Sequence, residues 1–314
     1  MLAGMIIVST SRMKLVLTLL AALTMGVGSV GAEKLGYVLQ AERLGNNRDA
    51  VLEKLRASDR DVLVLDEFFT EDSPWTSSEI ASLRAGRVGR RVIAYLSIGE
   101  AEDYRPYWQQ SWSTSPPSWL LGENPDWPGN FRVRYWRSEW QDVILDALDR
   151  IVASGFDGVY LDIVDAFEGF ERDPVTGEFQ DDMVNPETTQ SYRKDMIAWV
   201  QRVADRARAT NSDFWVVPQN GVQLLADAGF ASTISAVGVE DLFTNGNKTA
   251  NRDDRTFRLG FLQPFRDAGK PVFIIEYPRR AELKESARKA SKRRGFSLLL
   301  THRQLDQLGK AFKP

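Results

Sequence analysis

Short runs of apolar and β-branched residues recur along the chain, and longer segments with helical spacing of apolar positions lie between them. The run at 92–99 is apolar on both faces, which is typical of a parallel strand that helices cover. Eight such runs are predicted as strands: 35–40, 62–66, 92–99, 158–164, 214–218, 234–239, 272–277 and 296–301.

This alternation continues without a break in composition and predicts a single (β/α)8 TIM barrel of the α/β class. The alternative, a doubly wound sheet, usually opens with a phosphate-binding glycine turn, and the chain has no such motif. Two predicted connections are long, 100–137 after strand three and 165–184 after strand four. In a barrel, both emerge at the carboxyl ends of the strands, where active sites are built.

Local signals indicate where several helices begin and end. Residues 76–79 (Thr-Ser-Ser-Glu) and 138–141 (Ser-Glu-Trp-Gln) fit the capping box, and Asn185-Pro186 predicts the start of a helix that runs to about residue 210. Glycines are expected where helices end before the next strand, at Gly155, Gly229, Gly269 and Gly295.

The first residues resemble a targeting segment. Arg12 and Lys14 precede an apolar stretch, 15–27, and the small residues that follow fit cleavage after Ala32. We interpret 1–32 as a signal peptide and 33–314 as the barrel domain; a retained N-terminal anchor is the alternative. Because the apolar stretch is short for a membrane span, we expect a secreted or periplasmic protein without stable membrane insertion.

Composition narrows the possible chemistry. The 314 residues include no cysteine and one histidine, His302, which excludes thiolate metal sites and cysteine nucleophiles. No Gly-x-Ser-x-Gly turn is present to support a serine triad. The net charge of −3 gives no reason to expect a nucleic acid partner. We therefore expect Asp and Glu to carry the proton chemistry, with no cofactor and no metal.

Acidic residues fall at the ends of the predicted strands, where a barrel would gather them at one mouth. They are Asp66, Glu100, Asp162, Glu240 and Glu276. Side chains alternate along a strand, so Tyr160 shares a face with Asp162, and we predict that Tyr160 and Asp66 bind substrate. Small residues at 236 and 238 would leave room for a pocket beneath Glu240. The alternative is that an acid at such a position caps a helix or pairs with a basic neighbour, above all for Asp66, Asp165 and Asp241.

Aromatic residues concentrate in the connection after strand three. Six of the nine tryptophans fall between residues 108 and 140, and Tyr104 precedes them. Trp and Tyr rings stack well on the C–H faces of sugars, so Tyr104 and Trp108 are predicted to bind carbohydrate. The alternative is that such a long loop uses these rings as a small core of its own.

Four segments resemble the motifs of the family-114 glycoside hydrolase-like barrels, which are related to endo-α-1,4-polygalactosaminidases. They are 94–105 (AYLSIGEAEDYR), 155–162 (GFDGVYLD), 218–221 (PQNG) and 238–243 (GVEDLF), in the family's order. The resemblance implies a polysaccharide or oligosaccharide substrate rich in α-linked galactosamine, and Asp162 and Glu240 as the catalytic acids. It also implies that substrate is bound by Tyr95, Glu100, Asn220 and Glu276.

One departure concerns the amino sugar: relatives often carry an acid after the Asn-Gly pair, where this chain has Val222-Gln223. The leading hypothesis is an endo-acting glycosidase, monomeric, with Asp162 as nucleophile and Glu240 as general acid/base by analogy with other α-acting barrels. The alternatives are a non-catalytic carbohydrate-binding barrel in envelope or exopolysaccharide assembly, and an enzyme for another α-linked sugar. Retention or inversion depends on the separation of the carboxylates, which the sequence does not give.

Overall fold

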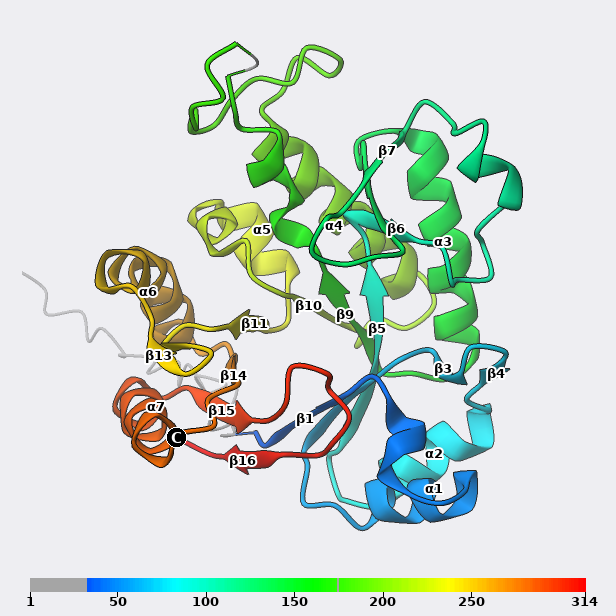
Figure 1. Ribbon diagram of the computed structural model, residues 1–314. Coiled ribbons are helices and arrows are strands. Elements are labelled where there is room, and N and C mark those ends of the chain that lie inside the picture. The colour runs from blue at the N-terminus through cyan, green and yellow to red at the C-terminus, as the bar shows by residue number, and fades with distance from the viewer. Residues whose placement is uncertain (1–32, 174) are drawn as a thin grey trace, which may run out of the picture. The chain divides into compact units, whose positions relative to one another are not determined.

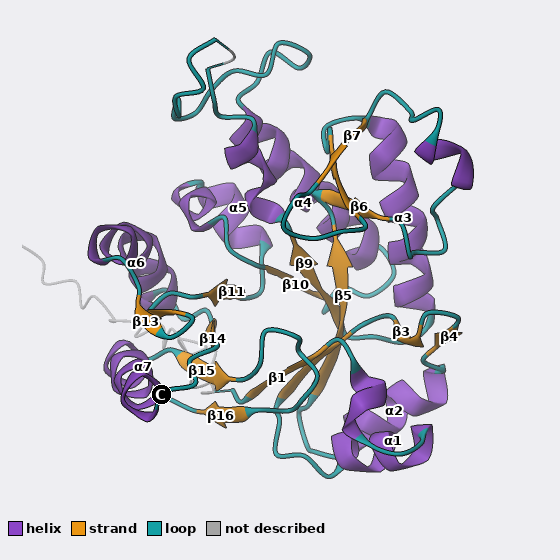
Figure 2. Cartoon of the chain, in the orientation of Figure 1, coloured by secondary structure: helices purple, strands orange, loops and turns teal. Residues whose placement is uncertain are grey.

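The computed structural model describes residues 33–173 and 175–314, so the interpreted signal peptide lies outside the described residues. Eight parallel strands form the centre of the described chain, as predicted (Figures 1 and 2). The strands are β1 (Leu35–Val38), β2 (Val62–Leu65), β5 (Arg91–Ser97), β9 (Gly158–Asp162), β10 (Trp215–Pro218), β11 (Val237–Glu240), β14 (Val272–Glu276) and β15 (Ser297–Leu300). Each strand overlaps the apolar run predicted for it.

The strands follow chain order around a (β/α)8-type barrel. β1, β2, β5, β9 and β10 pair in parallel, and β11, β14 and β15 form a second parallel group. A parallel bridge between Gln219 and Gly238 joins the two groups, and β15 contacts β1. After β15 the chain forms β16 (Lys310–Phe312), which pairs antiparallel with β15 where a simple repeat would place an eighth helix.

Helices cover the outer face of the strands (Figure 2). They are α1 (Arg48–Arg56), α2 (Ser77–Ala85), α3 (Ser138–Ala153), α4 (Tyr192–Arg208), α5 (Ala228–Thr233), α6 (Arg252–Asp267) and α7 (Ala281–Arg294). The capping box predicted at 76–79 is present before α2. The box predicted at 138–141 is wrong, because Ser138 lies inside α3 and the preceding Arg137 makes no side-chain cap.

Two further expectations about helix ends are corrected. α4 begins at Tyr192, where Ser191 caps it by accepting the N–H of Lys194, and not after Asn185. Gly229 lies inside α5, which is capped by Asp227. Gly155, Gly269 and Gly295 do follow helices, and each has the positive φ that glycine adopts without strain.

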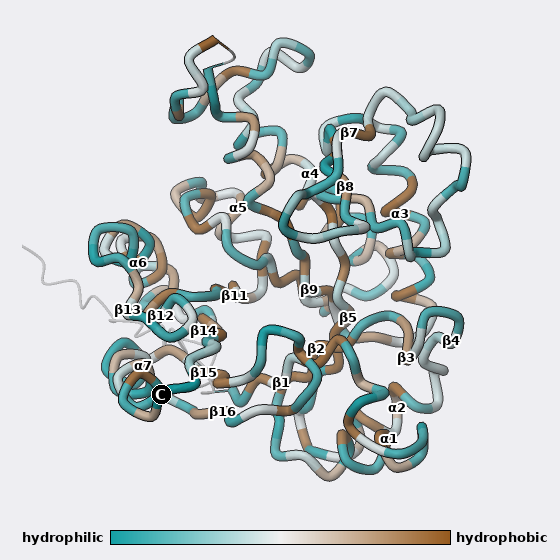
Figure 3. Tube along the Cα trace, in the orientation of Figure 1, coloured by the Kyte–Doolittle hydropathy of each residue, from teal (hydrophilic) through white to brown (hydrophobic). Residues whose placement is uncertain are grey.

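The strand side chains alternate between two apolar clusters. In β2, Val62 and Val64 face the barrel interior, while Leu63 and Leu65 pack toward the helices. The same parity turns Tyr160 inward, and Figure 3 shows hydrophobic residues along the central strands. Because Val237 and Val239 pack toward the helices, Glu240 shares the inward face with Gly238. The predicted parity of both carboxylate strands is therefore confirmed.

The two long connections differ in structure. The first contains η2 (Gln110–Ser113) and an antiparallel sheet in the order β6 (Glu100–Glu102), β8 (Asn130–Val133), β7 (Leu120–Glu123), which lies beyond the carboxyl ends of β5 and β9 in Figure 1. The second begins with η3 (Val164–Gly169). A hairpin of β3 (Phe68–Thr70) and β4 (Ser73–Pro74) follows β2.

The remaining short elements lie in other connections of the barrel. They are η1 (Ala41–Leu44), η4 (Val222–Ala226), and the paired β12 (Thr244–Asn245) and β13 (Lys248–Thr249). In the described part of the chain, no helix combines the length and the apolar character that a membrane crossing requires.

Candidate active site

Two carboxylates meet at the inner face of the barrel, at the ends of β9 and β11. The amide nitrogen of Gln219, which follows β10, donates to Asp162 Oδ1 at 2.8 Å and to Glu240 Oε2 at 3.1 Å. These two oxygens therefore lie no farther apart than the sum of 2.8 and 3.1 Å. This upper limit for one pair of oxygens is below the roughly 6.5 Å carboxyl separation at which inverting glycosidases begin.

The two carboxylates have different hydrogen-bond environments. Asp162 also accepts the hydroxyl of Tyr95 at 2.8 Å and the N–H of Ile163 at 2.9 Å. Glu240 also accepts the hydroxyl of Tyr277. Asp162 thus has three donors and Glu240 has two, so the ionised form is better supported at Asp162.

Burial raises the pKa of both groups, which favours the protonated forms. The pKa of Asp162 rises to about 6 despite the lowering effect of the Tyr95 hydrogen bond. The pKa of Glu240 rises to about 7, through burial and the adjacent charge of Asp162, against the lowering effect of Tyr277. Near neutral pH, the pair can therefore hold one ionised carboxylate and one protonated carboxyl.

A cavity of about 990 Å³ opens onto this pair and contains most of the predicted site residues. Besides Asp162 and Glu240, the predicted residues that line it are Asp66, Tyr95, Glu100, Tyr104 and Asn220. Further lining residues that sequence reasoning did not select are Tyr37, Glu102, Arg105, Asp165, Gln219 and Arg303. Gln219 had a usable signal, since it directly follows a strand at the same mouth as the acids.

Several predicted lining residues are already bound by the chain. Asp66 accepts two hydrogen bonds from the guanidinium of Arg105, at 2.8 and 2.9 Å. Glu100 is held by Asn124 and Asn130. The side-chain oxygen of Asn220 accepts the backbone N–H of Glu240 at 3.2 Å, so Asn220 also helps to position the carboxylate strand.

Three residues predicted to bind substrate lie outside the cavity lining. Trp108 packs on Trp112 and Phe131, with ring centroids 5.2 and 4.9 Å away, as the loop-core alternative expects. Tyr160 is fully buried beneath the site. Glu276 is fully buried and accepts the backbone N–H groups of residues 243 and 244. The structure therefore gives these three residues packing or positioning contacts.

The pocket expected beneath Glu240 is also corrected. The space beside Gly238 is filled by Tyr160, whose hydroxyl oxygen lies 1.9 Å from where a Cβ on Gly238 would stand. Tyr37 packs on Tyr160 with ring centroids 4.8 Å apart. Gly238 on β11 therefore leaves the space that the ring of Tyr160 fills, and the floor of the site is closed by Tyr160 and Tyr37.

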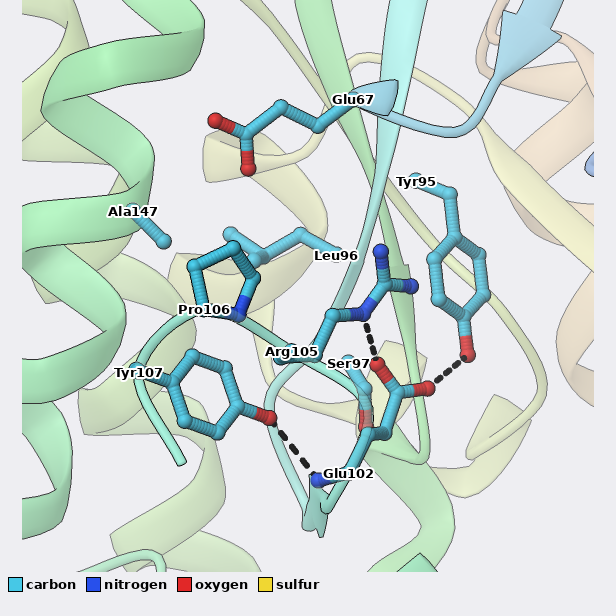
Figure 4. Close-up of a pocket in the computed structure, with 9 residues that line it drawn as sticks. All are labelled: Glu67, Tyr95, Leu96, Ser97, Glu102, Arg105, Pro106, Tyr107 and Ala147. Atoms are coloured by element: carbon cyan, nitrogen blue, oxygen red, sulfur yellow. Dashed lines mark hydrogen bonds and ion pairs between the residues drawn. The ribbon is translucent and has the colours of Figure 1, made fainter. Parts of the chain in front are cut away.

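An ion network lies beside Tyr95, the residue that donates to Asp162, and Figure 4 shows Glu102 between Arg105 and the hydroxyl of Tyr95. Arg105 bonds to Glu102 at 2.5 Å, and Glu102 lies 3.3 Å from the hydroxyl of Tyr95. Behind Arg105 is a cavity of about 10 Å³, the size of a single water. Tyr95 therefore stands between two carboxylates, and the nearer acceptor of its proton is Asp162.

Asp165, at the start of η3, is a third carboxylate in the cavity. Among the described residues, no other residue donates a hydrogen bond to its side chain or forms an ion pair with it; only its own backbone N–H bonds to the carboxylate. Burial, and then the charge of Asp162, raise its pKa to about 7. Its carboxyl group is thus available to a ligand that donates hydrogen bonds or carries positive charge.

Comparison with known proteins gives consistent matches. The model of "Glycoside-hydrolase family GH114" matches residues 40–313. An uncharacterized protein of Deinococcus radiodurans is 39% identical over 261 residues, covering 82% of this chain and 78% of the relative.

Solved structures show the same fold at low identity. The glycoside hydrolase domain of PelA from Pseudomonas aeruginosa matches with a TM-score of 0.63 at 18% identity, over 88% of this chain and 97% of that domain. Aspergillus fumigatus Ega3, solved in complex with galactosamine, matches with a TM-score of 0.61 at 21% identity, over 90% of this chain and 95% of Ega3.

Proposed function

Because the chain belongs to glycoside-hydrolase family GH114, we propose that it cleaves α-linked, galactosamine-containing polysaccharide at internal bonds, with Asp162 and Glu240 as its catalytic pair. The observation that carries the proposal is the amide bridge of Gln219 between these two carboxylates at the edge of a large cavity. A pair this close, with pKa values raised to about 6 and about 7, fits glycosidic cleavage.

The proposed roles follow from the two environments. Asp162, with three donors, attacks the anomeric carbon while the protonated Glu240 gives its proton to the departing glycosidic oxygen. The resulting glycosyl ester of Asp162 is then attacked by water, whose proton Glu240 takes, and Asp162 is released. The short separation of the carboxylates favours this two-step route, with net retention of anomeric configuration.

The substrate class rests on charge as well as on family. Asp165 is a carboxylate to which no other described residue donates a hydrogen bond, and Glu71 and Asp72 add acidic groups to the same cavity. An ammonium group at C2 of galactosamine would complement them, and Ega3 was solved with galactosamine. The departure at Val222-Gln223 has little bearing on the cavity, because Val222 is buried and Gln223 bonds to Glu168.

The cavity also supports cleavage at internal bonds. Its lining includes the β3–β4 hairpin, at Phe68 and Thr70, the carboxylate pair, and Trp127 in the turn between β7 and β8. A cavity of about 990 Å³ is larger than one sugar unit needs, so neighbouring units of a chain fit beside the one that is cleaved. We propose that the protein is secreted or periplasmic, in keeping with the interpreted signal peptide. We also propose that it acts as a monomer.

The test is incubation of the purified protein with α-1,4-linked galactosamine polymer and partly N-acetylated polymer, with products read by mass spectrometry. We expect internal oligosaccharides from the parent and none from Asp162→Asn or Glu240→Gln, which keep the shape of each side chain. Proton NMR of the first products would show α-anomers for retention. Binding without cleavage would refute the hydrolase proposal and favour the carbohydrate-binding barrel.

A further inference from the structure

Two exposed aromatic side chains of the connection after β5 line the cavity. Trp127 is 53% exposed and Tyr104 is 47% exposed, and both line the cavity that contains the carboxylate pair. By contrast, Trp112 and Trp119 in the same connection are buried in the loop's own aromatic core. An indole left open beside a polar cavity presents an apolar face with an N–H donor at its edge.

The turn that carries Trp127 is firmly held. The N–H of Trp127 donates to the carbonyl of Asn124 at 3.2 Å, and its carbonyl accepts the N–H of Asn130 at 3.0 Å. The backbone N–H of Asn124 donates to the carbonyl of Asn130 at 2.7 Å, and Asn124 Oδ1 accepts the N–H of Asp126 at 3.0 Å. The indole is thus exposed on an ordered backbone, so a ligand would meet a platform that is already in place.

The same turn explains the burial of Glu100. This carboxylate, only 4% exposed, accepts the side-chain amides of Asn124 at 2.8 Å and Asn130 at 3.3 Å. Burying a carboxylate is costly unless it is well bonded, and here the bonds go to the two residues that bracket Trp127. Glu100 therefore fastens the turn to β6, although the sequence suggested that it contacts substrate.

Tyr104 lines the same cavity. Its hydroxyl lies 3.4 Å from Asn130 Oδ1, and the guanidinium of Arg105 lies 5.3 Å from its ring centroid. We propose that Trp127 and Tyr104 form a carbohydrate subsite that stacks a pyranose ring flanking the cleaved bond, and that Glu100 positions its platform. This proposal rests on the proposed function and names the residues that hold a neighbouring sugar unit.

The first experiment measures binding without turnover. In the Asp162→Asn background, the full chain is titrated with α-1,4-linked galactosamine oligosaccharides of increasing length by calorimetry. We expect Trp127→Ala to weaken binding of the longer oligosaccharides at least tenfold and to leave the melting temperature nearly unchanged. The matched control, Trp108→Ala, is expected to lower the melting temperature and to keep the affinity.

A second experiment follows the indole directly. With 5-fluorotryptophan in all nine tryptophan positions, the ¹⁹F signal of Trp127 is identified by its loss in Trp127→Phe. We expect oligosaccharide to shift this signal and not that of Trp108. Glu100→Gln is expected to broaden or move the Trp127 signal before ligand is added, because one amide of the turn loses its acceptor.

These outcomes separate the subsite from catalysis. Affinity within twofold of the parent for Trp127→Ala would overturn the subsite even if the enzyme cleaves its polymer. A parent that binds none of the oligosaccharides would overturn it too. A parent that binds them through Trp127 but never cleaves them would leave the subsite standing and would refute only the hydrolase proposal.

Discussion

Tyr95 and Tyr277 each donate a hydrogen bond to one member of the carboxylate pair, and replacing them by phenylalanine should change the pH–rate profile in different ways. Tyr95→Phe should move its acidic limb, and Tyr277→Phe its alkaline limb. In the proposed mechanism, activity requires Asp162 ionised and Glu240 protonated, so the profile of kcat/KM should rise near pH 6 and fall near pH 7. The hydroxyl of Tyr95 lowers the pKa of Asp162, and that of Tyr277 lowers the pKa of Glu240. Removing either hydroxyl therefore raises one pKa.

The size of the effect follows from the hydrogen bonds. A hydrogen bond to a charged group contributes about 1.5–3 kcal/mol, which corresponds to about one to two pH units at about 1.36 kcal/mol per unit. Both tyrosines are buried, so solvent screening reduces this little. Tyr95→Phe should move the acidic limb upward and narrow the active range. Tyr277→Phe should move the alkaline limb upward and widen that range.

The assay is kcat/KM against pH with an activated aryl glycoside, with melting temperature as the control for folding. Because each phenylalanine keeps the ring, the melting temperature should fall only as far as the lost hydrogen bond requires, at about 2–4 °C per kcal/mol. The carboxylates titrate as a coupled pair, so each limb is compared between variants and not assigned in isolation. If Tyr95→Phe leaves the acidic limb in place or moves the alkaline one, the assigned roles are incorrect.

Three further outcomes are expected. Gly238→Ala should lower the free energy of unfolding in urea by about 1–3 kcal/mol, since the new Cβ would meet the hydroxyl of Tyr160 at 1.9 Å. The control Gly260→Ala, which has open space around it in α6, should raise that free energy by up to about 1 kcal/mol. Equal effects of the two variants would contradict this packing. Trp112→Ala should lower the free energy of unfolding by about 3–5 kcal/mol in the same assay, because the ring of Trp112 packs between Trp108 and Trp119. A change below about 1 kcal/mol would argue against an aromatic core within this loop. Burial raises the pKa of Glu240 and Glu276 to about 7, so between about pH 4.5 and 7 the folded chain holds protons that the unfolded chain has released. The stability that these groups contribute, measured by urea unfolding, should be greatest below about pH 4.5 and be lost toward pH 7. A rise of the free energy of unfolding over that range would be contrary to expectation.

The strands and their acids were predictable because both signals are local. Eight apolar runs gave eight strands, and alternation grouped Asp162 with Tyr160 and Glu240 with Gly238, as the structure has them. The start of α4 was not predictable, although the local signal at Asn185 is real. The side-chain oxygen of Asn185 does accept the N–H of Glu187, but its amide group donates to Asp195. The residue that caps α4 is Ser191, six positions after Asn185.

The finer site depended on contacts between distant segments. Gln219 and Tyr277 are neutral residues at strand ends, and only the closed barrel shows that each donates to an acid on another strand. Which tryptophan faces the cavity was equally hidden. Trp108 and Trp127 lie in the same connection, but Trp108 is partly buried against Phe131 of β8, whereas Trp127 in the turn between β7 and β8 is exposed.

The closed floor under the carboxylates has a consequence for product distribution. With Tyr160 filling the space beside Gly238 and Tyr37 packed on it, reagents have no route to the pair from within the barrel. In the proposed two-step mechanism, water and sugar hydroxyls must then reach the glycosyl ester of Asp162 through the same mouth, and they compete as acceptors. At high oligosaccharide concentration, transglycosylation should therefore increase, and products longer than the starting chains should accumulate beside the shorter ones.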